Sequence, residues 1–246
     1  MQPAAQRRQQ LVLMAREPSP GQVKTRLIPA LGPDRAAELY AAFVRDKISD
    51  VQAFRGEIAV TLAHTPATAP LLSGLCRGLD PAIQMTVQEG SSLPERMARL
   101  AAEMEPTPQA PLAIMGTDSP LLSMETVRDA YASLATTTDI VLIPDHGGGY
   151  CLIGMCTALP LAVFRGADGS RSSLERTRRA AMDAGFTVEC LAPQHDVDTG
   201  ADLEALIATI MDGPQQAELI APRTCALLVS WSLLNEAARD ATAHSP

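Results

Sequence analysis

Positive charge is scarce in this sequence. The chain carries 20 Lys and Arg residues against 28 Asp and Glu residues, a formal net charge of −8. A surface that binds nucleic acid needs clustered Lys and Arg side chains against the phosphates, so the composition argues against a nucleic-acid partner. A small phosphorylated substrate needs only a local pocket of positive charge and a bound cation, and the composition does not exclude it.

Long apolar runs are also missing. No stretch approaches the roughly 20 apolar residues needed to span a bilayer. The apolar run Leu11–Ala15, which follows a polar segment from Met1 to Gln10, is too short for a signal sequence. The five cysteines form no C-x-x-C pair, which predicts reduced thiols. We therefore expect a cytoplasmic protein with no membrane partner.

No internal repeat or low-complexity linker divides the 246 residues. We predict a single domain over residues 1–246, with a polar N-terminal tail at 1–10 and a helical C-terminal extension at 215–246. The extension carries too many apolar residues, among them Leu227 and Trp231, for a free surface. It therefore either packs on the domain or forms a homodimer contact.

Short apolar runs alternate with amphipathic patterns of helical period. Several of the runs are apolar on successive residues, as in strands covered on both faces. Seven strands are predicted, at Leu11–Ala15, Ile58–Ala63, Ile83–Val87, Pro111–Gly116, Ile140–Pro144, Tyr150–Met155 and Phe186–Ala192. Five helices are predicted, at Asp34–Val51, Ser92–Met104, Ser123–Leu134, Ser172–Ala184 and Thr199–Met211. This alternation predicts an α/β fold with a mainly parallel sheet flanked by helices on both faces.

Two of the predicted helices begin with the capping-box pattern S-x-x-E, at Ser92 and at Ser172. In that pattern the Ser hydroxyl and the Glu carboxylate satisfy free amides at the start of the helix.

Three cationic residues follow the first predicted strand, namely Arg16, Lys24 and Arg26. In an open α/β sheet, ligands bind beyond the carboxyl ends of the strands. Arg binds phosphate as a bidentate fork and Lys as a point charge, so this loop is placed to hold a polyphosphate. The alternative is a solvated basic loop, because K-x-R is common and the segment is neither a Walker A loop nor G-x-G-x-x-G.

Carboxylates occur at two other positions of the predicted crevice. Asp118 follows the fourth strand, and Asp196 and Asp198 form a D-x-D pair just before a helix. In extended backbone this spacing points both side chains to the same side, and Mg²⁺ is held in proteins by one or two carboxylates with phosphate oxygens and waters. The alternative is a capping role, which stays open above all for Asp196.

Three consecutive glycines, Gly147 to Gly149, separate two predicted strands. They allow the backbone to approach a ligand closely with free amides turned toward it. A simple hairpin turn explains them about as well.

Five motifs in this order resemble a bacterial family of small GT-A-fold transferases. They are P-G-Q-V-K-T-R-L-I-P-A-L-G, Q-E-G-S-S-L-P-E-R-M, G-T-D-S-P-L-L, G-G-Y-C-L-I-G and D-V-D-T-G-A-D-L. The family is DUF2064, also described as radical-SAM/selenodomain-associated glycosyltransferase-like proteins. The K-T-R-L element and the single Asp at a strand end are also similar, more distantly, to 2-phospholactate guanylyltransferases and molybdopterin-type nucleotidyltransferases.

The resemblance, which runs from about Leu11 to Leu206, implies a nucleotide-diphospho-sugar transferase fold. It implies that Lys24 and Arg26 contact phosphates and that Asp118 and Asp198 hold a divalent metal, Mg²⁺ or Mn²⁺. We therefore expect Lys24, Arg26 and Asp118 to act in catalysis. The residues expected to bind the nucleotide are Arg16, Lys24, Arg26, Gly148 and Gly149. Gln88 and Arg96 fall in a further family motif, to which the chemistry assigns no role.

Two segments depart from the family pattern, and both concern the acceptor. Where the family reads D-G-G-Y, this chain has Gly147 in place of the Asp, and Asp145 is two residues away. Where the family has Trp-Ser-Thr after Phe-x-Gly, this chain has a different segment, Ala167 to Arg171. The nucleotide half of the pattern is intact.

Three functions fit these residues. A nucleotidyltransferase would join a nucleoside triphosphate to a phosphorylated small molecule and release pyrophosphate, and the basic loop favours it because a triphosphate needs more positive charge than a diphosphate sugar. A glycosyltransferase would use a nucleotide-diphospho-sugar donor and, if it inverts configuration, a carboxylate base. The third function is nucleotide binding without catalysis. The expected partners are accordingly a nucleotide or nucleotide sugar and a small-molecule acceptor.

Overall fold

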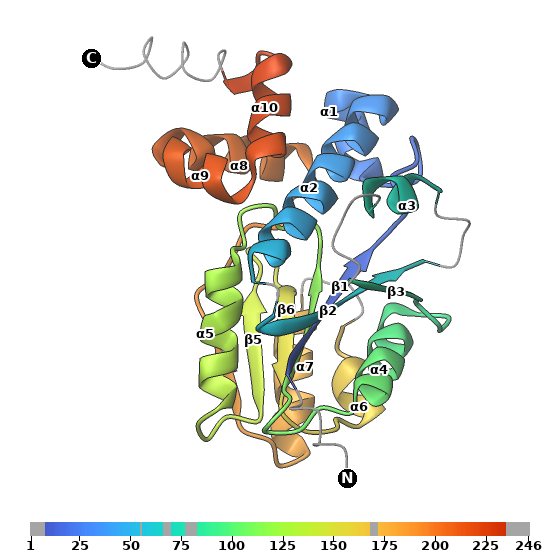
Figure 1. The fold of residues 1–246 in the computed structure, drawn as a ribbon, viewed down its shortest axis with the longest axis vertical. Helices are drawn as coiled ribbons and strands as arrows, with labels where there is room; N and C mark the ends of the chain where they lie inside the picture. Colours follow the sequence, from blue (N-terminus) through green and yellow to red (C-terminus); the bar gives the residue numbers. More distant parts are fainter. Residues whose placement is uncertain (1–7, 55, 66–69, 77–82, 168–171, 235–246) are drawn as a thin grey trace.

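The computed structural model describes residues 8–54, 56–65, 70–76, 83–167 and 172–234 (Figure 1). Seven strands form one sheet in the order β3-β2-β1-β4-β6-β5-β7. The strands are β1 (Gln9–Ala15), β2 (Ile58–His64), β3 (Gln84–Val87), β4 (Leu112–Gly116), β5 (Ile140–Pro144), β6 (Tyr150–Met155) and β7 (Val188–Cys190). Among the described strands, only β6 runs antiparallel to its neighbours, β4 and β5, so the predicted mainly parallel sheet is confirmed.

Helices cover both faces of the sheet, as predicted. On one face lie α2 (Pro33–Ala53) and α5 (Met124–Leu134), and on the other α4 (Leu93–Met104), α6 (Leu161–Phe164) and α7 (Ser173–Asp183). Along β1, Leu11 and Leu13 belong to the first core and Val12 to the second, because successive side chains of a strand point to opposite faces. Burial on both sides explains why the strand is apolar at every position from Leu11 to Ala15.

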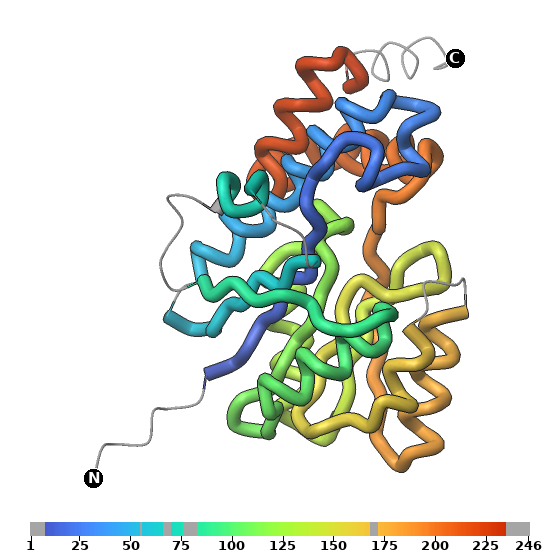
Figure 2. Tube along the Cα trace, turned by 90° about the vertical axis from the view of Figure 1, so that its right-hand side faces the viewer, coloured from blue at the N-terminus to red at the C-terminus, as the bar shows by residue number. Residues whose placement is uncertain are grey.

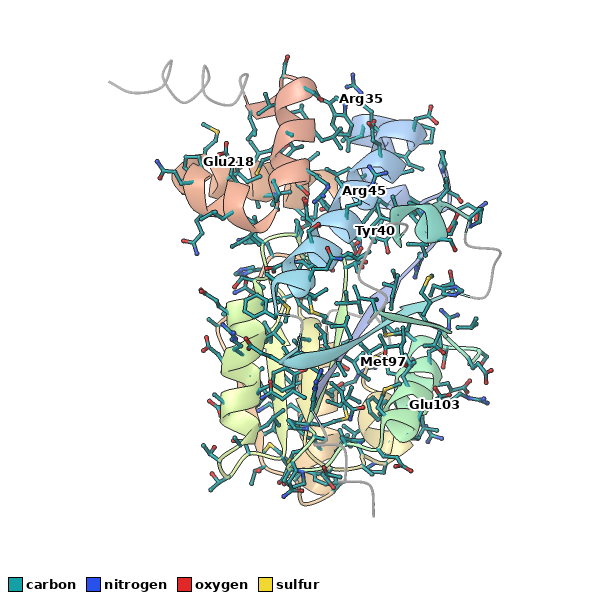
Figure 3. All side chains as sticks on the ribbon, in the orientation of Figure 1. Arg35, Tyr40, Arg45, Met97, Glu103 and Glu218 are labelled. Atoms are coloured by element: carbon teal, nitrogen blue, oxygen red, sulfur yellow. The ribbon has the colours of Figure 1, made fainter. Side chains whose placement is uncertain are left out.

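Helix α4 illustrates how the faces are filled. Met97 is buried in the core between this helix and the sheet, and Glu103 lies exposed on the same helix (Figure 3). Among the described residues, no helix combines the length and apolar character that crossing a bilayer requires.

Three helices gather at one end of the molecule, beside α1 (Ile28–Leu31) and α2 (Figure 2). They are α8 (Gly200–Asp212), α9 (Pro214–Ile220) and α10 (Pro222–Ser230). The predicted C-terminal extension packs on the rest of the chain through α10, which lies against α2. Its described part contains α9 and α10 as separate helices, since Pro222 has no N–H and starts a new helix after Ala221. A homodimer contact stays a prediction.

Several predicted boundaries differ from the structure. Strand β1 begins at Gln9, inside the predicted polar tail, and the strand predicted at Phe186–Ala192 is only Val188–Cys190. Four short helical elements, with three to seven residues each, were not predicted because they are too short to show a helical period. They are α1, α3 (Pro70–Cys76), α6 and the 3₁₀ helix η1 (Thr25–Leu27). Residues 1–7, 168–171 and 235–246 of the predicted segments lie outside the described residues.

The predicted capping boxes are only partly present. The Ser92 hydroxyl accepts from the amide of Glu95 at 3.4 Å, but the Glu95 carboxylate accepts from the amide of Ser91 and not from that of Ser92. The prediction at Ser172 was wrong, because its side chain makes no cap bond to α7. Both bonds of a capping box occur instead at the start of α8, between Thr199 and Asp202.

Candidate active site

A cavity of about 620 Å³ lies beyond the carboxyl ends of β1 and β4. Ligands bind at this edge of open α/β sheets, because the loops that follow parallel strands meet there. The cavity is lined by residues from several distant segments of the chain, most of them charged or polar, including Arg16, Arg26, Gln88, Arg96, Asp118, Asp145, His146, Gly149, His195, Asp196 and Asp198.

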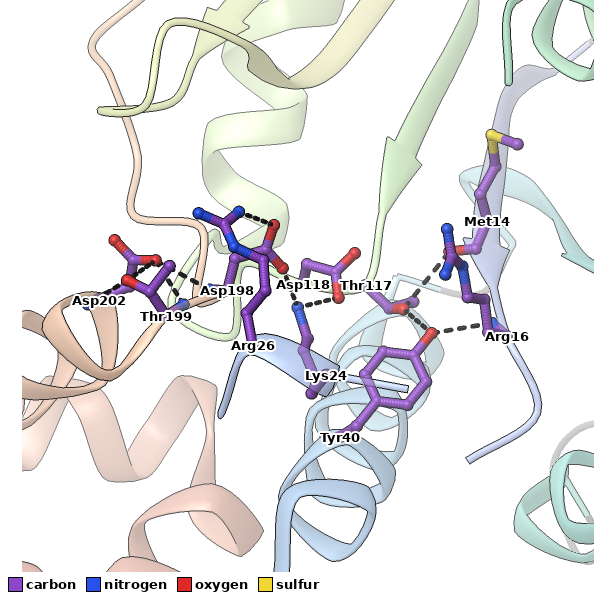
Figure 4. A network of polar contacts seen from close by, with 10 residues as sticks. All are labelled: Met14, Arg16, Lys24, Arg26, Tyr40, Thr117, Asp118, Asp198, Thr199 and Asp202. Carbon is purple, nitrogen blue, oxygen red and sulfur yellow. Dashed lines mark hydrogen bonds and ion pairs between the residues drawn. The ribbon is translucent and has the colours of Figure 1, made fainter. Parts of the chain in front are cut away.

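Lys24 joins the basic loop to the acidic residues of the cavity (Figure 4). Its ammonium group donates to Oδ1 of Asp198 at 3.0 Å and forms an ion pair with Oδ1 of Asp118. Arg26 lies 3.6 Å from Oδ2 of Asp198. The structure therefore brings together the four residues on which the sequence hypothesis depends, although they come from three segments far apart in the chain.

The burial of these four residues is unequal. The Lys24 side chain is only 4% exposed, whereas Asp118 and Asp198 are 40% and 46% exposed and Arg26 is 65% exposed. The carboxylates therefore keep oxygen atoms accessible to a ligand, and Arg26 can turn toward an anion.

Charge pairing dominates the electrostatics of the cluster. Burial lowers the pKa of Lys24, but the carboxylates of Asp118, Asp198 and Asp196 outweigh it and raise that pKa. Burial raises the pKa of Asp198, but Lys24, Arg26 and Arg16 together outweigh it, so the net pKa of Asp198 is lowered. Both groups are therefore charged at neutral pH, and their attraction is strong because the ammonium is withdrawn from water.

Lys24 has a left-handed backbone, with φ 47° and ψ 41°. This conformation costs a non-glycine residue on the order of 1 kcal/mol and persists where the surroundings impose it. The buried side chains of Val23 and Leu27 anchor the loop on both sides of Lys24. A strained residue that bonds two carboxylates is typical of a binding site.

Asp196 completes a group of three carboxylates. One oxygen from each of Asp118, Asp196 and Asp198 lies within 4.8 Å of the other two. Oδ1 of Asp196 is buried without a hydrogen-bond partner among the described residues. Burial and the charge of Asp118 raise the pKa of Asp196 well above its usual range. The D-x-D spacing indicated this proximity, but the capping alternative had left Asp196 outside the predicted metal site.

Tyr40 of α2 connects the loops after β1 and β4, a role that the sequence did not indicate. Its hydroxyl accepts from the amide of Arg16 at 2.8 Å and lies 3.0 Å from the Thr117 hydroxyl. The Thr117 hydroxyl in turn donates to the carbonyl of Met14 (Figure 4). Burial raises the pKa of Tyr40 to about 12, so the phenol stays neutral and fixes both loops. In the sequence, Tyr40 was one of several apolar residues in a helical stripe.

Lys47, also on α2, donates hydrogen bonds to the backbone of the loop after β4. It is buried, and its ammonium donates to the carbonyls of Pro120, at 2.9 Å, and Leu122. Burial lowers the pKa of Lys47 to about 8, although Asp50 and Asp46 partly oppose this effect. Lys47 therefore supports the backbone next to Asp118.

The glycine segment is the turn between β5 and β6. Oδ1 of Asp145 accepts from the amides of Gly147, at 2.7 Å, and Gly149, at 2.8 Å. A Cβ at Gly149 would lie 2.5 Å from Oδ2 of Asp145. The absence of side chains at these glycines thus leaves room for the carboxylate of Asp145. The amide of Gly149 already donates to that carboxylate and is not free to bind a ligand in this structure. Gly149 lines the cavity, whereas Gly148 is not among its lining residues.

Gln88 and Arg96 also line the cavity. The Gln88 side-chain amide donates to the carbonyls of Ala15 and Ala63, at 3.1 and 2.8 Å, and so joins the ends of β1 and β2. Nε of Arg96 donates to the carbonyl of Gly90 at 3.1 Å. These bonds give both residues a structural role that the sequence pattern could not assign.

Comparisons with known proteins agree with this architecture. A family model described as "Uncharacterized protein conserved in bacteria (DUF2064)" matches residues 49–171. No curated protein matches the sequence significantly. A solved structure from Desulfovibrio desulfuricans G20, described as a "putative nucleotide-diphospho-sugar transferase", is 28% identical with a TM-score of 0.78, over 92% of this chain and 96% of that one.

Two more distant structures share the fold alone. The 4-diphosphocytidyl-2C-methyl-D-erythritol synthase of Anaerococcus prevotii DSM 20548 is 10% identical with a TM-score of 0.55, over 83% of this chain and 96% of that one. A cytidylyltransferase from Leptospira borgpetersenii is 12% identical with a TM-score of 0.50, over 94% of this chain and 97% of that one. The fold is therefore GT-A-like, as the sequence resemblance implied.

Proposed function

This chain belongs to the DUF2064 family of bacterial proteins, and we propose that it is a transferase that uses a nucleotide, specifically a metal-dependent nucleotidyltransferase. Its substrates would be a nucleoside triphosphate and a phosphorylated small molecule. The observation that carries the proposal is the ion pairing of Lys24 with both Asp118 and Asp198 at the carboxyl ends of the strands.

The reaction requires only group transfer between phosphates. An oxygen of the acceptor phosphate forms a bond to the α-phosphorus of the triphosphate, the bond from that phosphorus to the bridging oxygen of the β-phosphate breaks, and pyrophosphate leaves. Positioning and charge stabilisation suffice for such a step, and no protein nucleophile is needed. Arg16, Lys24 and Arg26 would bind the triphosphate and stabilise the charge that develops on the departing pyrophosphate.

The three carboxylates fit a divalent cation. Their oxygens are the ligand type that Mg²⁺ and Mn²⁺ prefer, and Asp196 contributes a buried oxygen without a partner among the described residues. We propose that Asp118 and Asp198 hold the ion and that Asp196 lies beside them. A bound ion would neutralise phosphate charge during transfer. Three carboxylates face Lys24 and the more distant Arg26, and this acidic surplus favours a further cation.

A second candidate function is glycosyl transfer from a nucleotide-diphospho-sugar. The likeness to the Desulfovibrio protein, which is described as a nucleotide-diphospho-sugar transferase, favours it. An inverting reaction would need a free carboxylate base near the acceptor. Asp145 lines the cavity, but two amides of its own turn already bond its carboxylate. Nucleotidyl transfer makes no such demand, and we favour it for that reason.

Release of pyrophosphate tests the proposal. Each nucleoside triphosphate would be incubated with Mg²⁺ and a panel of sugar phosphates and phosphorylated acids. We expect release with at least one pair, and its loss in Asp118→Asn but not in the matched surface variant Asp129→Asn. Transfer from a nucleotide sugar without pyrophosphate release would establish the second candidate instead.

A further inference from the structure

Two histidines stack against each other on the wall of the cavity. The rings of His146 and His195 have centroids 4.2 Å apart and an interplanar angle of 32°. Both residues line the same cavity as the three carboxylates. His146 belongs to the turn between β5 and β6, and His195 directly precedes Asp196.

The backbone holds the two histidines in place. The segment that contains His195 runs beside the end of β5 through a bridge between Asp145 and Gln194. The amide of Gln194 donates to the carbonyl of Pro144 at 2.8 Å. The stacking therefore rests on a defined backbone pairing and not on two free loops.

Neither imidazole has a hydrogen bond or an ion pair to another described residue. Among the neighbouring carboxylates, Asp145 accepts from the amides of its own turn and Asp202 accepts from the amides of Asp198 and Thr199. Oδ1 of Asp196, the residue after His195, has no hydrogen-bond partner among the described residues. By contrast, Nδ1 of His64 lies 2.9 Å from the carbonyl of Thr65. Every imidazole carries at least one N–H donor, so the pair offers donors to a ligand in the cavity.

The sheet order separates this pair from the basic loop. Lys24 and Arg26 follow β1, Asp118 follows β4, and the histidines lie beyond the adjacent ends of β6 and β5, in the order β1-β4-β6-β5. In the order of the strands, Asp118 thus lies between the basic loop and the two histidines. A triphosphate on the β1 side would leave the histidine side to the second substrate.

We propose that His146 and His195 bind the oxyanion of the acceptor and so select phosphorylated or carboxylated acceptors over neutral ones. The claim that the bound oxyanion belongs to the acceptor rests on the proposed function, whereas the oxyanion site itself does not. Each N–H would donate to an oxygen of the anion on the β5–β6 side of the cavity.

Histidine-selective NMR of the full chain tests the site without turnover. Inorganic phosphate, and in a parallel arm acetate, would be titrated at fixed pH and ionic strength. We expect the ring signals of His146 and His195 to shift with saturation, while the His64 signal stays in place as the reference. A stronger response to phosphate assigns a phosphorylated acceptor, and a stronger response to acetate assigns a carboxylated one.

Variants locate the anion. His146→Gln should weaken phosphate binding by about tenfold or more at the remaining His195 signal, as expected for a lost charge-assisted bond. The shifts should persist in Lys24→Met, because binding at the basic loop is not their cause. The proposal is wrong if the two signals move no more than that of His64, or if Lys24→Met abolishes their response. If the histidine signals shift but no substrate pair releases pyrophosphate, the oxyanion site is supported and the proposed nucleotidyltransferase activity is wrong.

Discussion

Lys24 bonds Asp118 and Asp198 at once, with its side chain buried and its backbone left-handed. Its charge is therefore in place before any ligand arrives. The same ammonium also competes with a divalent cation for the oxygens of both carboxylates. Two opposite effects follow for a variant that lacks the charge.

Lys24→Met should weaken the binding of nucleoside triphosphate by about 1.5–3 kcal/mol, or roughly 10- to 150-fold in Kd, the scale of a lost charge-assisted bond. Binding of Mg²⁺ alone should become tighter, because the carboxylates lose their internal cation. Calorimetry with each ligand measures both constants. Arg45→Met, which changes an exposed side chain on α2, is the control. If both dissociation constants are unchanged in Lys24→Met, the basic loop does not bind the triphosphate.

Lys47 makes a prediction about pH. Its folded-state pKa of about 8 lies below the ordinary value of 10.5, so above pH 8 the folded protein loses a proton that the unfolded chain still holds. Lys47 therefore contributes a rise in the free energy of unfolding between about pH 8 and 10.5, by at most about 1.4 kcal/mol per pH unit. Urea unfolding across this range should show that the free energy of the parent relative to that of Lys47→Met increases with pH. Parallel curves for the two proteins would contradict the lowered pKa.

At the scale of the elements, the sequence predicted all seven strands and the five long helices. It did so because burial on both faces makes the central strands, such as β4 and β5, continuously apolar, and because the helices are long enough to show a period. The short helices and the break at Pro222 were missed or misread, since local pattern is weak there and tertiary contacts decide. In the site, strand ends indicated Asp118 and the basic loop, whereas Tyr40 and Lys47 resembled ordinary helix residues because their partners lie about 75 residues away in the chain.

Asp46 anchors the C-terminal helices to α2. Its buried carboxylate accepts from the amides of Arg223, at 3.1 Å, and Thr224, at 2.8 Å, and from the Thr224 hydroxyl. Carboxylates at the N-terminus of a helix satisfy its free amides and its dipole. The anchoring bond thus comes from another helix rather than from a local cap.

Asp46→Ala should lower the free energy of unfolding by about 2–4 kcal/mol, because buried donors lose their only charged acceptor. Hydrogen exchange at Arg223 and Thr224 should accelerate. Ser49→Ala, which removes only a contact to the exposed guanidinium of Arg223, should change stability by no more than about 0.5 kcal/mol. Equal effects of the two substitutions would show that Asp46 does not anchor α10.

At the scale of the whole molecule, an acidic protein with a net charge of −8 binds an anionic substrate only where cations are concentrated. In the described part of the cavity, one oxygen from each of Asp118, Asp196 and Asp198 lies within 4.8 Å of the other two, and Lys24 and Arg26 pair with two of these carboxylates. Substrate and metal should therefore bind cooperatively, because each neutralises the repulsion that the other meets.

Thermal unfolding tests whether the nucleotide and the metal bind cooperatively. The cognate nucleotide with Mg²⁺, at about 100 times its Kd, should add about 2.7 kcal/mol of stability, or roughly 5–10 °C in Tm for a chain of this size. The nucleotide with EDTA, or Mg²⁺ alone, should add much less. An equal shift with EDTA would show that the metal takes no part in binding.

Helix α2 carries Tyr40, Asp46 and Lys47 within two turns, about 10 Å along its axis. One rigid rod thus reaches the substrate loops, the backbone beside Asp118 and the C-terminal helices. A sequence change that loosens α10 will be transmitted through this rod to residues that bind substrate, so loss of activity in such a variant need not mean that α10 touches the reactants.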